Sequence, residues 1–115
     1  MKSHRVLIID REKTISDQLA AMFDRQGWIS QSAPSAMAGI ASAPRFRPTV
    51  VLLDLVAPTM DPTLFATLAR SSTREAVVII GMATVDGAQR QPQGIDDVLV
   101  KPIELADVVR AIARR

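Results

Sequence analysis

Apolar residues occur along this chain in short continuous runs, and the segments between the runs show helical periodicity instead. A continuous run of Val, Ile and Leu is typical of a parallel strand that helices cover on both faces. A segment of mixed polarity suits the edge of such a sheet. The pattern predicts five strands, at Val6–Ile9, Trp28–Ser32, Thr49–Leu53, Ala76–Ile80 and Asp97–Val100, with Trp28–Ser32 at an edge.

Helical spacing of apolar residues predicts helices after the first, second, third and fifth strands. Thr14 and Asp17 resemble a capping box at the start of the first helix, and Asp61 is expected to cap the third. Pro44 is expected to stop the second helix. The helices are predicted to run from Thr14 towards Gly27, from Pro34 to Pro44, from Pro62 onward, and from about Ile103 to the end of the sequence.

The segment between the fourth and fifth strands differs from the other connections. Ala83–Gly94 contains Gly87, Pro92 and several glutamines, and it has no apolar stripe. Glycine and proline both disfavour a helix interior, and a helix without an apolar face gains nothing from packing. We therefore expect a mobile loop here, with at most one helical turn at Ala88–Gln91.

Alternation of strands and helices, joined by right-handed crossovers, predicts a doubly wound parallel sheet. The length of 115 residues suits a single domain spanning residues 1–115. Hydrophobic residues make up 48% and aromatic residues only 3%, which favours helices packed on a sheet through aliphatic side chains.

Charge and targeting signals limit the partners. A net charge of +2 gives no argument for nucleic-acid binding by this domain. No apolar stretch approaches the roughly 20 residues that a membrane helix needs, and the short run after the basic N-terminus cannot form a signal peptide. With no cysteine, the composition fits a soluble cytoplasmic protein with no membrane contact.

Three polar residues follow the apolar runs directly. Asp10, Asp54 and Lys101 each come immediately after a predicted strand. Because the carboxyl ends of the strands in an open α/β sheet meet in one crevice, we expect these three side chains to lie together. Two carboxylates and a lysine favour a site for phosphate and a divalent metal, whose ligands here must be oxygens or His4.

Three motifs resemble the receiver domains of bacterial two-component response regulators. They are the strand ending in Asp10, the loop Asp54–Asp61, and the stretch Gly94–Pro102 that ends in Lys101-Pro102. The resemblance covers the whole chain. It implies a flavodoxin-like fold with strand order 2-1-3-4-5.

The resemblance also implies a function, which is to accept a phosphoryl group from a histidine kinase with the help of Mg²⁺. Asp54 corresponds to the phospho-acceptor and Lys101 to the phosphoryl contact. The metal is implied to lie between Asp10, Asp54 and the backbone carbonyl of Val56. Implied partners are a histidine kinase or another two-component protein, with a homodimer as a further option, and the domain is not itself an enzyme.

Several positions depart from the family pattern. Arg11 stands in place of the second acid, and Val98 in place of an inward-turning aromatic residue. Gly81 or Met82 occupies the place of the switch hydroxyl, which Thr84 could supply only if its loop reached back. The helix between the fourth and fifth strands, the family's fourth, is short or missing. These departures predict an atypical, pseudo-receiver-like domain that acts through protein–protein interaction.

Arg11 has three interpretations. It points to solvent and leaves Glu12 to bind the metal, or it forms a fixed cation in the site, or it is an interaction residue at the rim. Exchanging a carboxylate for a guanidinium about 5 Å from a divalent ion costs roughly 3 kcal/mol even in bulk water. That corresponds to about a hundredfold in affinity. We therefore expect Mg²⁺ binding to be weak or absent, with Arg11 as a built-in cation beside Asp10 and Asp54.

Two alternatives stay open. A conventional Mg²⁺-dependent receiver would tolerate Arg11 by using Asp10, Glu12 and Asp54 as ligands. A flavodoxin-like ligand-binding domain would need a loop rich in Gly, Ser or Thr after the first strand, and residues 10–13 have the wrong chemistry for that.

Overall fold

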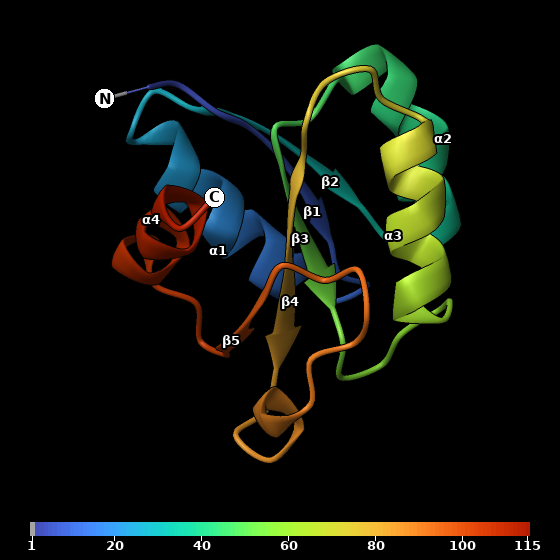
Figure 1. The fold of residues 1–115 in the computed structure, drawn as a ribbon. Helices are drawn as coiled ribbons and strands as arrows, with labels where there is room; N and C mark the ends of the chain where they lie inside the picture. The colour runs from blue at the N-terminus through green and yellow to red at the C-terminus, as the bar shows by residue number, and fades with distance from the viewer. Residues whose placement is uncertain (1) are drawn as a thin grey trace.

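A five-stranded parallel sheet forms the centre of the computed structural model, which describes residues 2–115 (Figure 1). The strand order is β2-β1-β3-β4-β5, which confirms the predicted flavodoxin-like topology. The strands are β1 (Arg5–Ile9), β2 (Ile29–Ala33), β3 (Val50–Asp54), β4 (Val78–Ala83) and β5 (Asp97–Val100).

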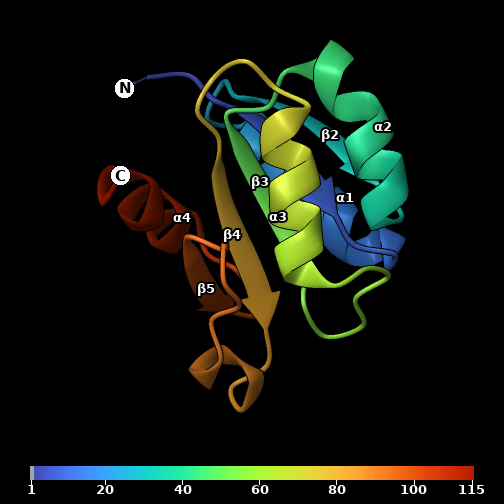
Figure 2. The ribbon, with the colours of Figure 1, turned by 45° about the vertical axis from the view of Figure 1, so that its right-hand side comes forward.

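Four helices cover the two faces of the sheet (Figures 1 and 2). Helices α2 (Ala36–Phe46) and α3 (Pro62–Ser71) lie on one face, and α1 (Lys13–Asp24) and α4 (Leu105–Ala113) lie on the other. Each face has its own apolar cluster, with Phe65 in the first and Phe23 in the second, both fully buried. No helix in residues 2–115 is long and apolar enough to cross a membrane.

Of the two predicted helix caps, the one at Asp61 is confirmed, and the structure shows a further cap at Ser35. Asp61 accepts a hydrogen bond from the Leu64 amide at 3.0 Å, and Ser35 accepts one from Ala38 at 3.1 Å. The capping box predicted at Thr14 is wrong. Helix α1 begins one residue earlier, and Asp17 pairs at 3.0 Å with the Lys13 ammonium one turn away instead.

Two predicted boundaries are also wrong. Helix α2 continues past Pro44 to Phe46, and Arg47 then ends it in the left-handed conformation at φ 58°. Strand β4 runs from Val78 to Ala83 rather than from Ala76 to Ile80, because its backbone stays paired with the neighbouring strands as far as Ala83. Tertiary pairing thus overrides the weak strand propensity of Gly81 and Ala83.

The β4–β5 connection contains no full helix, as predicted: within residues 84–96 only a 3₁₀ turn, η1 (Gly87–Gln89), is helical. Side chains lie directly on the sheet in place of the helix. A Cβ atom at Gly81 would come within 2.4 Å of Leu55 Cδ1 and 3.5 Å of Ile95 Cγ2. Ile95 is only 3% exposed. Leu55 and Ile95 therefore cover this part of β4, and only a residue without a side chain leaves room for them.

The end of this connection is tied to α3. The Arg70 guanidinium donates to the Gly94 carbonyl at 2.6 Å and to the Asp96 carboxylate at 2.8 Å. The same Asp96 oxygen accepts from the Ile79 amide at 2.8 Å. These contacts anchor residues 94–96, so the mobility predicted for Ala83–Gly94 stays a prediction for the part before Gly94.

Candidate functional site

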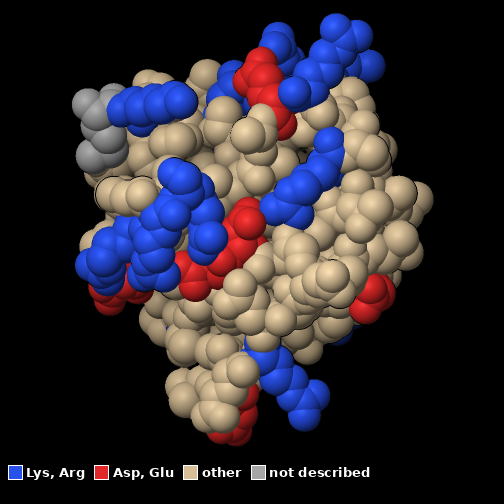
Figure 3. Space-filling model, viewed as in Figure 1, with Lys and Arg blue, Asp and Glu red and all other residues tan. Residues whose placement is uncertain are grey.

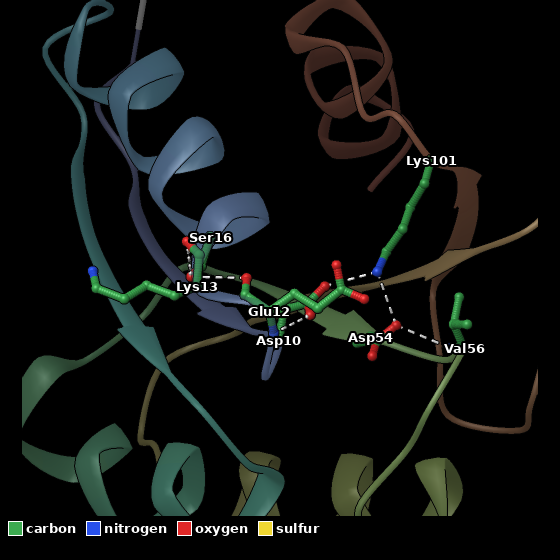
Figure 4. A network of polar contacts seen from close by, with 7 residues as sticks. All are labelled: Asp10, Glu12, Lys13, Ser16, Asp54, Val56 and Lys101. Atoms are coloured by element: carbon green, nitrogen blue, oxygen red, sulfur yellow. Dashed lines mark hydrogen bonds and ion pairs between the residues drawn. The ribbon is translucent and has the colours of Figure 1, made fainter.

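The three polar strand-end residues meet at the carboxyl edge of the sheet (Figure 4). Asp54 is the last residue of β3, Asp10 directly follows β1, and Lys101 directly follows β5. The Lys101 ammonium lies 2.7 Å from Asp10 Oδ2 and 3.1 Å from Asp54 Oδ1. One cation therefore bridges two carboxylates that are 44 residues apart in the chain.

Backbone amides fix the orientation of both carboxylates. The Glu12 amide donates to Asp10 Oδ1 at 2.9 Å, and the Val56 amide donates to Asp54 Oδ1 at 2.9 Å. The Asp10 side chain is fully buried and both of its oxygens are engaged. Asp54 is 8% exposed at its side chain, and its Oδ2 accepts no hydrogen bond from residues 2–115. Asp54 Oδ2 is therefore the free oxygen of this site.

Lys101 is held in its charged form by its two partners. Burial lowers the pKa of Lys101. The hydrogen bonds from its ammonium to Asp10 and Asp54, together with the charges of these two acids, raise the pKa by more than burial lowers it, so the net shift is upward. Two carboxylates and one ammonium leave a net charge of −1 at the site. This negative charge favours a further cation.

Glu12 and Arg11 differ in their relation to the site. The Glu12 side chain points toward Lys101 and Asp54 in Figure 4. Arg11 is exposed, forms no ion pair within residues 2–115, and lines a hollow of about 10 Å³ together with Asp10 and Asp54. The cation fixed between the acids is thus Lys101, and Arg11 lies beside them at the rim, where its role as a built-in cation stays a prediction.

The donor set fits a hard divalent cation. Asp10 and Asp54 place carboxylate oxygens in the site, and these are a ligand type that Mg²⁺ prefers. The backbone carbonyl of Val56 stays a predicted ligand. Residues 2–115 contain no cluster of three or more His, Asp or Glu side chains placed to hold a metal. Only two acids are therefore in position, and Glu12 would have to move to become a third.

Comparison with known proteins identifies the family. Residues 6–113 match the family model described as the response regulator receiver domain. The chain belongs to that family. It is 32% identical over 119 residues to the DNA-binding dual master transcriptional regulator RpaA of Synechocystis, which covers 96% of this chain and 49% of RpaA. It is 28% identical to Protein PilH of Pseudomonas aeruginosa, covering 94% of this chain and 93% of PilH.

Solved structures show the same fold. The response regulator receiver domain (CheY-like) of Methylobacillus flagellatus superposes with a TM-score of 0.82 at 13% identity, covering 98% of both chains. The signal receiver domain of Bermanella marisrubri gives 0.80 at 22% identity, again covering 98% of both. This chain spans about half the length of RpaA. Receiver domains are signalling modules rather than enzymes; they interact with histidine kinases and phosphotransfer proteins and typically bind Mg²⁺ at the phosphorylation site.

Of the two candidates for the switch position, Gly81 and Met82, the one beside Asp54 is Met82. The strand register pairs Asp54 with Met82 and Leu53 with Gly81, so Met82 is the neighbour of the candidate acceptor. The Met82 side chain is fully buried in the apolar cluster beneath α1 and α4. Thr84 is exposed, and its hydroxyl accepts from the Gly87 amide at 3.3 Å. Thr84 therefore closes its own turn and does not replace the missing hydroxyl.

Thr59 is a site neighbour that the sequence did not reveal. It lies in the loop after Asp54 and lines the same small hollow. Its hydroxyl accepts from the Ala36 amide at 2.9 Å, which ties the acceptor loop to the first turn of α2. Thr59 lies 23 residues after Ala36, so no short-range sequence pattern could predict the hydrogen bond between them. Only the fold brings these two residues together.

Proposed function

We propose that this domain is an atypical receiver whose phospho-acceptor is Asp54, and that it passes on its signal through protein–protein contact. The observation that carries the proposal is the difference between the oxygens of the two acids. Both oxygens of Asp10 and one of Asp54 are engaged, whereas Asp54 Oδ2 is free at the surface of the crevice. A nucleophile needs such an oriented but unshielded oxygen.

The proposed step transfers one phosphoryl group. Asp54 Oδ2 forms a bond to the phosphorus of a phosphohistidine, the P–N bond breaks, and the released imidazole nitrogen takes a proton. Lys101 lies 3.1 Å from the other oxygen of Asp54, so its ammonium is close enough to neutralise charge on the incoming phosphoryl oxygens. Asp10 positions Lys101 through their contact at 2.7 Å.

A divalent cation, when bound, would neutralise further charge on the phosphoryl group. Asp10, Asp54 and the Val56 carbonyl would hold it. Arg11 at the rim opposes it, because a second positive charge near the ion lowers its affinity.

The atypical character of the proposal rests on the residues that would report phosphorylation. Met82 is built into the core beside Asp54, and Val98 is a half-buried aliphatic residue packed against the α2–α3 cluster. Neither side chain has a hydroxyl or an aromatic ring to move towards a phosphoryl group. The domain would therefore respond without the hydroxyl and aromatic movements of the family.

The acceptor is tested with a small phosphodonor and Mg²⁺, read by intact mass. Wild type should gain one phosphoryl group and Asp54→Asn none. Asp61→Asn is the matched control, because Asp61 only caps α3 and should leave labelling intact. Equal labelling of wild type and Asp54→Asn would refute the assignment.

The metal is tested by titrating Mg²⁺ against wild type and Arg11→Asp and following amide NMR shifts. The proposal expects Arg11→Asp to bind about a hundredfold more tightly. Ordinary affinity in wild type, with no gain in the variant, would favour a conventional receiver. The orientation of Glu12 toward the site in Figure 4 favours that second candidate, and Glu12→Gln would then weaken binding.

A further inference from the structure

Strand β2 forms one edge of the sheet, and within residues 2–115 it pairs only with β1. Edge strands present unpaired N–H and C=O groups to other chains, and proteins commonly block them with charged residues, proline or a bulge. Ile29–Ala33 contains neither a charge nor a proline, and it pairs residue for residue with Arg5–Ile9. Ile29 is 53% exposed, and Gln31 and Ser32 are exposed as well. The outer side of β2 is therefore accessible to a further strand.

The backbone groups that β2 presents at this edge belong to its two serines. The Ile29 amide donates to the His4 carbonyl at 3.0 Å, so the backbone groups of Ile29 point toward β1. Successive residues of a strand in a parallel ladder point their N–H and C=O groups to opposite sides. Those of Ser30 and Ser32 therefore point away from β1, to the free edge of the sheet.

A hollow of about 420 Å³ lies between β2 and α2. Gln31 lines it from β2, Ser42 and Arg45 line it from α2, and Arg5 lines it from β1. Ile29 and Gln31 are two residues apart in a strand, so their side chains share the α2 face. A strand added beside β2 would present alternate side chains to this same face. One of them would enter the hollow, and the next but one would lie against Ile29.

The hollow is positively charged. Arg45 is exposed and forms no ion pair within residues 2–115. The Arg5 guanidinium donates to the Phe46 carbonyl at 2.8 Å and lies 4.6 Å from the centre of the Phe46 ring. Arg47, by contrast, pairs with Glu75. Basic atoms predominate at the top of Figure 3, over the end of α2. None of the described residues that line the hollow is acidic, so the hollow favours a carboxylate from outside.

We propose that the free edge of β2 binds an extended acidic segment of a partner protein, which adds a strand to the sheet. The backbone of the segment pairs with Ser30 and Ser32, and one of its acidic side chains enters the hollow beside Arg45. An aliphatic side chain two residues away packs on Ile29. In this mode of recognition, main-chain hydrogen bonds provide affinity and alternate side chains provide specificity.

Two other occupants fit the edge less well. The β2 strand of a second copy contains no acid, so it would leave Arg45 without an opposite charge. A single-stranded nucleic acid would need aromatic side chains on which its bases could stack. Among residues 2–115, none of the strongly exposed large hydrophobic side chains is aromatic. An acidic protein segment satisfies both the backbone groups of the edge and the guanidinium.

The probe is a short synthetic peptide in which Val and Glu alternate with Thr, titrated into the domain and followed by amide NMR shifts and hydrogen exchange. We expect saturable shifts along β2. Exchange at the Ser30 and Ser32 amides should slow by at least about tenfold at saturation, because these donors become paired. Exchange at the Ile29 amide should change little, since it already donates to His4.

Two variants test the contacts separately. Ser32→Pro removes one outward donor, and proline is tolerated where the N–H of an edge strand faces solvent. It should weaken binding about tenfold. Arg45→Glu should weaken binding about fivefold, and a peptide with Lys in place of Glu should restore it. Arg74→Glu is the matched control, because Arg74 is equally exposed and lies outside the hollow, and it should leave affinity unchanged.

Several results would overturn the proposal. They are the absence of saturable shifts, shifts confined to other surfaces, unchanged exchange at both serines, and equal affinities of Arg45→Glu and Arg74→Glu. Shifts along β2 that follow protein concentration without peptide would identify a second copy as the occupant and would also overturn it. Unchanged shifts at the amides of β3 and β4 in Ser32→Pro would show that this variant is folded. None of these measurements requires Asp54 to be phosphorylated, so they are independent of the proposed phospho-acceptor.

Discussion

The ends of β1, β3 and β5 and the end of β4 lie side by side, yet they have kept the receiver pattern to different degrees. The first three carry Asp10, Asp54 and Lys101 in mutual contact. At the end of β4, Met82 lies beside Asp54 and has no hydroxyl, and a 3₁₀ turn follows where the other strand connections carry a helix. On the proposed function, the candidate acceptor site and the positions that would report phosphorylation are therefore structurally separable within one edge of the sheet.

The difference has a physical basis in how each group of residues is held. Asp10 and Asp54 are oriented by amides two residues further along the chain and by Lys101, so these contacts do not involve the β4–β5 connection. Met82 depends instead on apolar packing beneath α1 and α4. A residue with a hydroxyl at position 82 would have to turn its side chain out of that apolar cluster to reach Asp54. Four predictions test this contrast between the polar contacts of the acids and the apolar packing of Met82.

The largest effect is expected from restoring the hydroxyl. Met82→Thr should destabilise the domain by about 4 kcal/mol, because it opens a cavity and buries a hydroxyl without a partner. Met82→Leu, the volume-matched control, should cost less than about 1.5 kcal/mol. Urea unfolding measures both. A Met82→Thr variant as stable as wild type would contradict this contrast, because a hydroxyl could then be introduced beside Asp54 by one substitution.

The next effect concerns the cover of β4. Ile95→Ala should cost about 3 kcal/mol, because Ile95 is 3% exposed in the α2–α3 cluster. Val85→Ala, in the same connection but 69% exposed, should change stability by less than about 0.5 kcal/mol. The measurement is again urea unfolding. A neutral Ile95→Ala would show that residues 84–96 do not act as a packed substitute for a helix.

Lys101→Met should cost about 2 kcal/mol by leaving two carboxylates without their bridging donor. The pKa of Lys101 is raised in the folded state, so its stabilisation is complete below the ordinary lysine pKa and is lost as pH rises through the raised value. The difference between wild type and variant should thus be constant from neutral pH to about pH 10 and shrink above it. Lys13→Met, at an exposed pair, should show no such profile. A difference that disappears already near neutral pH would contradict the bridged site.

The smallest effect is expected at Thr59. Thr59→Val removes the acceptor for the Ala36 amide and should cost about 1 kcal/mol, whereas Thr59→Ser should retain most of the stability. Comparing phosphodonor labelling in the two variants tests whether the link also positions the acceptor loop. If Val and Ser behave alike, Thr59 has no role in joining the loop to α2.

The sequence was sufficient for the features that depend on local pattern. Asp10, Asp54 and Lys101 were found because each follows an apolar run, and the missing helix because Gly87 and Pro92 interrupt a segment without an apolar stripe. Strand order followed from the family resemblance. These are the properties that short-range periodicity and strand-end position encode.

What the sequence could not provide depends on pairing across the fold. The end of β4 was placed three residues too early, because only its pairing with β3 and β5 shows that Gly81 to Ala83 continue the strand. Arg11 was expected beside the acids and lines the same hollow, but the sequence could not show that Lys101, rather than Arg11, forms the ion pairs with both acids. Thr59 had no local signature at all.

The two hydrogen bonds on Asp54 Oδ1 bear on how long a signal would last. Once Oδ2 carries a phosphoryl group, Oδ1 becomes the carbonyl oxygen of a mixed anhydride, still within reach of the Val56 amide and the Lys101 ammonium. Donors on a carbonyl oxygen draw electrons from its carbon and favour attack by water. The contacts that orient Asp54 for phosphorylation would also shorten the lifetime of the phosphorylated aspartate. The site would then limit the duration of the signal as well as accept the phosphoryl group.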